Sequence, residues 1–266
     1  PETRMVFVET IANPRTQVAD LAGIGQLCRE RGLIYVVDNT ITSPALFLPR
    51  AVGASLVINS LTKTIAGHGD ALGGAVTDTG LFDWALYPNI FAAYRKGDPK
   101  GWGLLQIRKK GLRDMGGTLS SDQAHRISVG SETLALRMKQ SCNTALALTR
   151  WLEQHPKVDA VHYPFLPSHA EHERAKTLFA AGSWLLSFEL HDPSSMIDVL
   201  NRLALPIKAT GLGDTRTLII PVAPTIFWEA GPEARAAMGI AEGLIRVSVG
   251  LEDEADLIAD FDRALD

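Results

Sequence analysis

The stretch ASLVINSLTK, residues 54–63, contains an apolar run of strand length and ends in a lysine. The segment 18–31, farther upstream, has apolar positions at helical spacing, which predicts a helix. Strands that are apolar on both faces and alternate with helices predict a parallel sheet covered by helices. Runs of this buried-strand type occur at residues 5–9, 33–38, 56–59 and 74–77.

The second half of the chain has a different pattern. Residues 121–154 predict a helix, interrupted only at Gly130, that is long enough to bridge two domains. After Pro156, short strands and helices alternate, which favours a smaller α/β domain with an antiparallel sheet. We therefore expect the chain to divide into residues 1–120 and 121–266. Within the second part, strands are expected at 158–163, 184–188, 218–222 and 244–249, and helices at 194–203 and 252–265.

Composition limits the class of partner. The chain has 266 residues, with 26 Lys+Arg against 30 Asp+Glu, a formal net charge of -4 and no basic block. A nucleic-acid partner and a polybasic membrane anchor are therefore disfavoured, and a small molecule is favoured. Cys28 and Cys142 form no paired motif, so a reducing, cytoplasmic location is expected. No apolar run approaches the roughly 20 residues of a membrane span.

Polar side chains follow the predicted strands of the first sheet. Glu9 and Asn13 come at and after the first strand, Asp38 ends the second, and Lys63 follows the third. Ligands of such sheets bind at the carboxyl ends of the strands, so we expect these side chains to share a site. An ammonium just past a buried strand is poorly solvated, which lowers its pKa and favours Lys63 as a Schiff-base former.

The residues around this lysine suit a phosphorylated cofactor. Ser60 and Thr62 would share one face of an extended backbone, where their hydroxyls can hold phosphate oxygens. Asp38 can pair with a pyridinium nitrogen, and together these groups fit pyridoxal 5'-phosphate. Each group also has an ordinary interpretation, because a lysine after a strand is commonly a solvated surface residue and an aspartate there commonly forms a turn.

Four segments resemble the Cys/Met-metabolism family of pyridoxal-phosphate enzymes, in the family's order. They are ETIANP at 9–14, VVDNT at 36–40, SLTK at 60–63 followed by GHGDALGG, and IRVSVGLED at 245–253. HYPFLPSH at 162–169 is similar to the family's tyrosine-proline segment. The resemblance implies the aspartate-aminotransferase-like α/β fold, fold type I. Residues 1–120 would then be the C-terminal part of a large, mostly parallel-sheet, cofactor-binding domain, and residues 121–266 a linking helix and smaller α/β domain.

The resemblance also assigns roles to individual residues. Lys63 would hold pyridoxal phosphate and move protons, and Arg246 would bind the substrate α-carboxylate. Gly211 stands in the substrate-pocket loop where most members carry serine or asparagine, so its contact would come from the backbone. The other cofactor contacts implied are Asp38 to the pyridine nitrogen, Ser60 and Thr62 to the phosphate, and Asn13 to the 3'-oxygen.

The activity implied is γ-elimination or γ-replacement on a sulfur-containing or homoserine-derived amino acid. Members of this type are cystathionine γ-synthases, methionine γ-lyases and sulfhydrylases, which are homotetramers with shared active sites. The alternatives are β-elimination of the cystathionine β-lyase type and a non-catalytic truncated oligomerisation module. A nicotinamide oxidoreductase is disfavoured, because Gly67, Gly69 and Gly73 do not have dinucleotide-loop spacing.

Three departures from the family pattern bear on substrate and completeness. Thr210 stands where cystathionine γ-lyases often carry glutamate, which disfavours cystathionine-like substrates, and residues 221–227 lack the family's usual histidine. The family's N-terminal portion, with its phosphate loop and cofactor-stacking tyrosine, is not in the sequence, so we expect the chain to be the larger part of a family chain.

A histidine-rich segment offers a competing metal interpretation. His169 and His172 lie one helical turn apart beside Glu171 and Glu173. No further ligand cluster accompanies them, so a solvated helix start is favoured and no metal site is expected.

Overall fold

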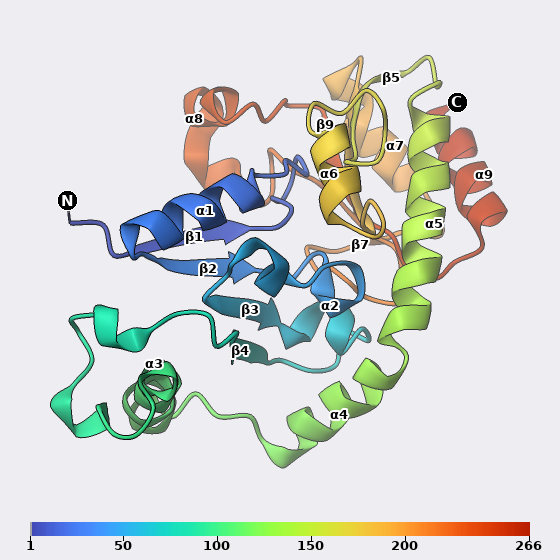
Figure 1. Cartoon of the computed structure of the whole chain (residues 1–266). Coiled ribbons are helices and arrows are strands. Elements are labelled where there is room, and N and C mark those ends of the chain that lie inside the picture. Colours follow the sequence, from blue (N-terminus) through green and yellow to red (C-terminus); the bar gives the residue numbers. More distant parts are fainter. Residues whose placement is uncertain (1) are drawn as a thin grey trace.

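The structure is a computed structural model that describes residues 2–266, and it contains two sheets (Figure 1). The four-stranded sheet has the order β1-β2-β3-β4. The first three strands are parallel, as expected, whereas β4 is antiparallel to β3. The expectation that residues 5–9 and 74–77 are buried strands is wrong, because both strands have no buried residue and Met5 and Phe7 are 47% and 54% exposed. The segment that joins β3 to β4 contains no long crossover helix. The chain reverses its direction within this segment, whose ends are joined by a hydrogen bond from Leu61 N to Gly73 O (2.9 Å). The strands are β1 (Met5–Glu9), β2 (Ile34–Asp38), β3 (Leu56–Ser60) and β4 (Gly74–Asp78).

The second sheet has five strands in the order β5-β6-β9-β8-β7. Its pairs are antiparallel apart from β7 with β8, which confirms the expected sheet type. Strand β7 has only two residues and was too short for sequence periodicity to predict. The strands are β5 (Val158–His162), β6 (Leu185–Leu190), β7 (Ile207–Lys208), β8 (Leu218–Pro221) and β9 (Leu244–Ser248).

Helix ends follow their capping residues. Helix α1 (Leu21–Arg31) begins later than expected, because the Asp20 side chain accepts from Gly23 N (3.0 Å), and it ends at Gly32 in the left-handed region. The last helix, α9 (Glu254–Leu265), is capped in the same way by Asp253. The remaining helices are α2 (Ser43–Leu46), α3 (Trp102–Gln106), α4 (Ser121–Glu132), α5 (Leu134–Leu152), α6 (His172–Leu178), α7 (Met196–Arg202) and α8 (Gly231–Ala237).

The helix expected over 121–154 is interrupted at Thr133 and not at Gly130, which lies within α4. Thr133 separates α4 from α5 with non-helical dihedral angles, and its hydroxyl accepts a hydrogen bond from Arg137 Nε (3.0 Å). Figure 1 shows the change of direction between the two helices along one side of the molecule. Short turns complete the chain: 3-10 turns at Pro49–Val52, Trp84–Leu86, Ala92–Tyr94, Pro99–Gly101, Pro193–Ser195 and Trp228–Ala230, and π turns at Leu61–Ile65 and Ile107–Arg113.

The two sheets are joined by a shared core and by buried hydrogen bonds. One hydrophobic cluster combines Ile11 and Leu21 from the first part with Met138 and Trp184 from the second. Trp184 Nε1 donates to Ile41 O (2.9 Å). The division into domains near residue 120 stays a prediction, but the packing places the carboxyl ends of β1–β3 beside the second sheet. Within residues 2–266, no helix is long and apolar enough to cross a membrane.

Candidate active site

The carboxyl ends of the three parallel strands meet at one cavity. The strand register sets Glu9 of β1 opposite Asp38 of β2, and Ser60 ends the next strand, with its amide donating to Thr40 Oγ1 (2.9 Å). The cavity has a volume of about 190 Å³. Its lining comes from both halves of the chain: Glu9, Ile11, Asn13, Asp38, Thr40, Ile41, Ser60, Lys63 and Leu212.

Lys63 lies in the turn that follows β3. The turn is a π turn interrupted at Lys63 itself, whose dihedral angles are non-helical (φ -81, ψ -134). Burial, and secondarily the charge of Arg246, lower the pKa of the Lys63 amine. The direction agrees with the sequence-based expectation. A larger share of this amine is therefore unprotonated near neutral pH than for an exposed lysine, as nucleophilic and proton-transfer chemistry requires.

Arg246 approaches the site from the second sheet. It lies on β9, is 2% exposed, and its Nη2 donates to Thr210 O (2.9 Å) and Gly211 O (3.2 Å). Its Nη1 lies 3.5 Å from Asn13 Oδ1, and its Nε is buried without a partner. Burial lowers the pKa of Arg246 to about 10. Because none of its partners is a carboxylate, the guanidinium keeps both a charge and a free donor for an anionic ligand.

A pair of carboxylates lies at the strand ends. Burial, and next the charge of Asp38, raise the pKa of the Glu9 carboxyl. Asp38 Oδ1 accepts from Thr40 N (2.9 Å), which orients the Asp38 carboxylate at the end of its strand. Two neighbouring carboxyl groups in a half-buried place favour a cationic partner. The sequence placed Glu9 at the site but assigned it no role.

Two of the residues predicted to bind the cofactor have other contacts in the structure. The Thr62 hydroxyl donates to Gly73 O (3.2 Å) and accepts from Gly73 N (3.0 Å), and Thr62 is not among the cavity lining. The chain turns at Leu61, so the extended backbone that would place Ser60 and Thr62 on one face is absent. Gly211 holds Arg246 through its carbonyl. Direct contacts of Thr62 and Gly211 with a ligand stay predictions.

Arg137 on α5 is a site residue that sequence reasoning missed. It is 9% exposed and lies behind the lysine turn. Its Nη1 donates to Thr64 O (2.6 Å), and its Nη2 donates to Ile65 O (3.2 Å) and Gly130 O (2.6 Å). These bonds fix the turn that carries Lys63. An arginine within an otherwise apolar helix stripe was the available signal, but its partners lie far away in the sequence.

Glycines next to the turn allow this close packing. A Cβ added at Gly67 would come 2.1 Å from Arg137 Nη1, and Gly67 has a φ of +78. A Cβ at Gly213 would come 2.7 Å from Thr64 N. Gly213 N donates to Ser248 Oγ (2.9 Å), which ties its loop to β9. Larger residues at either position would displace the lysine turn.

The segment at His169 and His172 leads into α6, which begins at His172, so the expected helix start is confirmed. The expectation that it is solvated is wrong for the two histidines, because their side chains are only 6% and 14% exposed. Among residues 2–266, no group of three or more His, Cys, Asp or Glu side chains is arranged to hold a metal ion.

The fold and the site define an α/β protein of the aspartate-aminotransferase-like fold type, with its lysine at the strand ends and its arginine on the second sheet. The chain belongs to the family of Cys/Met metabolism PLP-dependent enzymes, which it matches over residues 1–266. The donor set fits the family's cofactor, pyridoxal phosphate, because a lysine of lowered pKa and a carboxylate pair line one cavity.

Named relatives differ in activity. The chain is 36% identical to homocysteine synthase of Schizosaccharomyces pombe, over 99% of this chain and 65% of the relative. It is 37% identical to L-methionine gamma-lyase of Pseudomonas putida, over 100% of this chain and 62% of the relative. A putative O-acetylhomoserine (thiol)-lyase of Campylobacter jejuni, solved with N'-pyridoxyl-lysine-5'-monophosphate, has a TM-score of 0.91 and 31% identity, covering 99% of this chain and 66% of that one. The chain thus spans less than two thirds of the length of the first two relatives.

Proposed function

We propose that the protein is a pyridoxal-phosphate-dependent enzyme that performs γ-elimination or γ-replacement on a sulfur-containing or homoserine-derived amino acid. The observation that carries the proposal is the pairing of two groups at one site. Lys63 supplies an amine of lowered pKa, and Arg246 supplies a buried guanidinium with no carboxylate partner. An amino-acid substrate needs one group to take its α-proton and another to hold its carboxylate.

The cavity residues would hold the cofactor in a defined orientation. Lys63 would bind it covalently, Asp38 would face its ring nitrogen, Ser60 and Thr62 its phosphate, and Asn13 its 3'-oxygen. When bound, pyridoxal phosphate supplies an electron sink for a carbanion at the substrate α-carbon. Glu9 adds negative charge beside Asp38, which favours a protonated ring nitrogen.

The protein's own residues would then bind the substrate and move its protons. Arg246 would hold the α-carboxylate by its planar guanidinium, and this contact sets the α-carbon against the Lys63 amine. The amine would remove the α-proton and, in a γ-reaction, a proton from the β-carbon as well. Arg137 would keep the amine in place by holding the carbonyls at Thr64 and Ile65.

The names of the relatives support a γ-reaction over the alternatives. One relative is named homocysteine synthase and another L-methionine gamma-lyase, and the second name states a reaction at the γ-position. Thr210 offers no carboxylate for a distal substrate amine, which disfavours cystathionine. A non-catalytic oligomerisation module is disfavoured because a partly buried lysine and a buried arginine without carboxylate partners are costly to retain. A cytoplasmic homotetramer with shared active sites completes the proposal, by resemblance.

The test is spectroscopic and chemical. The protein with pyridoxal phosphate should show a visible absorption band that borohydride removes, and peptide mapping should locate the reduced adduct at Lys63. The variant Lys63→Ala should form no such adduct, whereas the exposed-lysine variant Lys139→Ala should behave as the unmodified protein. A reducible adduct retained in Lys63→Ala would sink the assignment. Turnover of methionine against homoserine esters plus sulfide would then separate elimination from replacement.

A further inference from the structure

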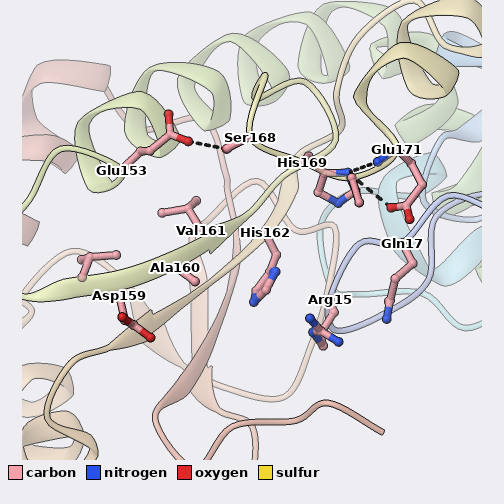
Figure 2. A pocket seen from close by; sticks show the side chains of 12 residues that line it. Arg15, Gln17, Glu153, Asp159, Ala160, Val161, His162, Ser168, His169 and Glu171 are labelled. Carbon is pink, nitrogen blue, oxygen red and sulfur yellow. Dashed lines mark hydrogen bonds and ion pairs between the residues drawn. The ribbon is translucent and has the colours of Figure 1, made fainter.

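A second cavity lies apart from Lys63, between the segment that follows β1 and the β5 edge of the second sheet (Figure 2). Its volume is about 520 Å³, against about 190 Å³ for the Lys63 cavity. The two cavities share no lining residue. Figure 2 shows Arg15 and Gln17 reaching into the space from one segment, and His169 and Glu171 from the segment before α6. The roles proposed for the first cavity therefore leave this one unexplained.

Arg15 is an unpaired cation in this cavity. Within residues 2–266 its guanidinium makes no hydrogen bond and no ion pair, and its Nε is buried without a partner. The group is nevertheless held in place, because it packs so closely on Gly239 that a Cβ there would come 2.3 Å from Arg15 Nη1. A partly buried cationic donor without an acceptor is costly. A bound anionic group would remove that cost.

Glu171 is the matching carboxylate. Its side chain is 25% exposed, and its Oε2 lies 3.4 Å from His169 Nδ1. Glu171 N donates to His169 Nδ1 (3.3 Å), so this ring nitrogen carries no proton, and burial lowers the pKa of the imidazole although Glu171 acts in the opposite direction. The neutral ring leaves the charge of Glu171 uncompensated. No ion pair joins Arg15 to Glu171 in the described part of the chain, so the two charges flank the cavity separately.

The other charged groups of the cavity already have partners. His162 Nε2 lies 2.6 Å from Glu189, Asp159 lies 3.2 Å from His191, and Glu153 accepts from the Ser168 hydroxyl. The lining thus carries one guanidinium, that of Arg15, and three carboxylates, those of Glu153, Asp159 and Glu171. Val158, Ala160 and Val161 of β5 add an apolar wall.

We propose that this cavity is a second ligand site, which binds a free α-amino acid with a small apolar side chain. The ligand carboxylate would pair with Arg15 and its ammonium with Glu171, while its side chain would lie on the wall of β5. A zwitterion supplies a carboxylate to Arg15 and an ammonium to the carboxylates of the lining, whereas phosphate would meet the nearby carboxylates of Glu171 and Asp159. The site is distinct from the substrate-carboxylate position at Arg246.

The proposed site is connected to the first cavity by a short segment. Asn13 lines the Lys63 cavity and accepts from Arg246, and Arg15 follows two residues later. Between them, Pro14 O accepts from Ser187 Oγ (2.6 Å), which ties the segment to β6. A ligand that positions Arg15 is thereby placed to act on Asn13.

The proposal can be tested by calorimetric titration of the full chain with L-valine. We expect one valine per chain, with isovalerate, isobutylamine and inorganic phosphate each binding about tenfold more weakly or not at all, because each lacks one of the two charges or adds a repulsive one. Arg15→Gln and Glu171→Gln should each weaken valine binding by about tenfold or more. Arg246→Gln should retain it, as should Arg29→Gln, which removes an exposed arginine of α1.

Several results would overturn the proposal. They are no binding up to about 10 mM valine, equal binding of isovalerate or phosphate, and affinity that survives both Arg15→Gln and Glu171→Gln. Loss of binding in Arg246→Gln alone would assign the ligand to the first cavity. Thermal unfolding of each variant guards against misfolding, and if Arg15→Gln unfolds, Glu171→Gln decides.

Discussion

Arg137 and Arg246 are two buried arginines with no carboxylate partner, on opposite sides of the lysine turn. Arg137 has a partner for every guanidinium nitrogen: Nε bonds Thr133 Oγ1, and Nη1 and Nη2 bond backbone carbonyls. Arg246 bonds carbonyls and Asn13 through its two terminal nitrogens, but its Nε is buried without a partner. Burial lowers the pKa of both groups. The difference in hydrogen bonding, rather than in burial, therefore separates Arg137, which holds the turn, from Arg246, which we propose binds the substrate.

The largest effect is expected from Arg246→Gln, which tests the ligand-binding side of the comparison. Loss of the charge should lower kcat/KM for amino-acid substrates by a factor that corresponds to about 2–4 kcal/mol of transition-state stabilisation, because the substrate carboxylate loses its buried partner. Arg246→Lys keeps the charge but lacks the planar guanidinium, so its kcat/KM should lie between those of Arg246→Gln and the unmodified protein. Steady-state kinetics with methionine provides the measurement, and an unchanged kcat/KM in Arg246→Gln would remove this residue from the site.

The next effect is expected from Arg137→Gln, which tests the positioning side. The change should lower the free energy of unfolding by about 1–3 kcal/mol, because the carbonyls at Thr64, Ile65 and Gly130 lose their donor. Denaturant titration measures this loss, and hydrogen exchange over residues 61–67 should rise with it. If Arg137→Gln instead raised KM with stability intact, the assignment of roles to the two arginines would be reversed.

A smaller effect should distinguish Lys63 from both arginines through pH. Its pKa is lowered in the folded state, so the unfolded state binds more protons between that lowered pKa and the ordinary value of 10.5. The resulting cost to stability is present in full below the lowered pKa and is lost as pH rises through 10.5. In cofactor-free protein, Lys63→Met should therefore be more stable than the unmodified protein at neutral pH. The stability difference between the two proteins, measured by denaturant titration at several pH values, should shrink as the solution becomes alkaline. A difference that does not vary with pH would contradict a lysine whose pKa is lowered by partial burial.

The smallest effect is expected from Gly211→Ser, which leaves the carbonyl contact to Arg246 in place. A Cβ at this position would come 2.9 Å from Leu218 Cδ1, the movable end of a side chain, so the loss of stability should stay below about 1 kcal/mol. The kcat/KM should change less than in Arg246→Gln. A collapse of activity in Gly211→Ser with stability retained would show that the loop, and not Arg246, dominates substrate binding.

The sequence predicted most of the elements that build the site. The runs at 5–9, 33–38 and 56–59 became adjacent parallel strands, and their carboxyl ends brought Glu9, Asp38 and Ser60 to one cavity. Periodicity succeeded there because each strand is short, apolar and bounded by polar residues. Periodicity failed for β7, which has only two residues. It also failed for the helix break at Thr133, whose hydroxyl accepts a hydrogen bond from Arg137 Nε.

The direction of a side chain was harder to predict from the sequence than the position of its residue in the fold. Thr62 was expected to face the cofactor with Ser60, but the turn at Leu61 directs its hydroxyl to Gly73, 11 residues away. The second cavity was not expected at all. The charged groups proposed to bind its ligand are Arg15 and Glu171. The sequence analysis named Glu171 only as part of a histidine-rich helix start.

The sequence by itself determined the order of strands and helices along the chain, the segments that resemble the family, and the kinds of side chain at the strand ends. Only the tertiary structure decided which of the buried arginines has a free donor. The physical reason is that Arg246 meets Asn13 across 233 residues and Arg137 meets Thr64 across 73. Hydrogen-bond partners that distant are set by how the two sheets pack, and no local pattern around either arginine encodes them.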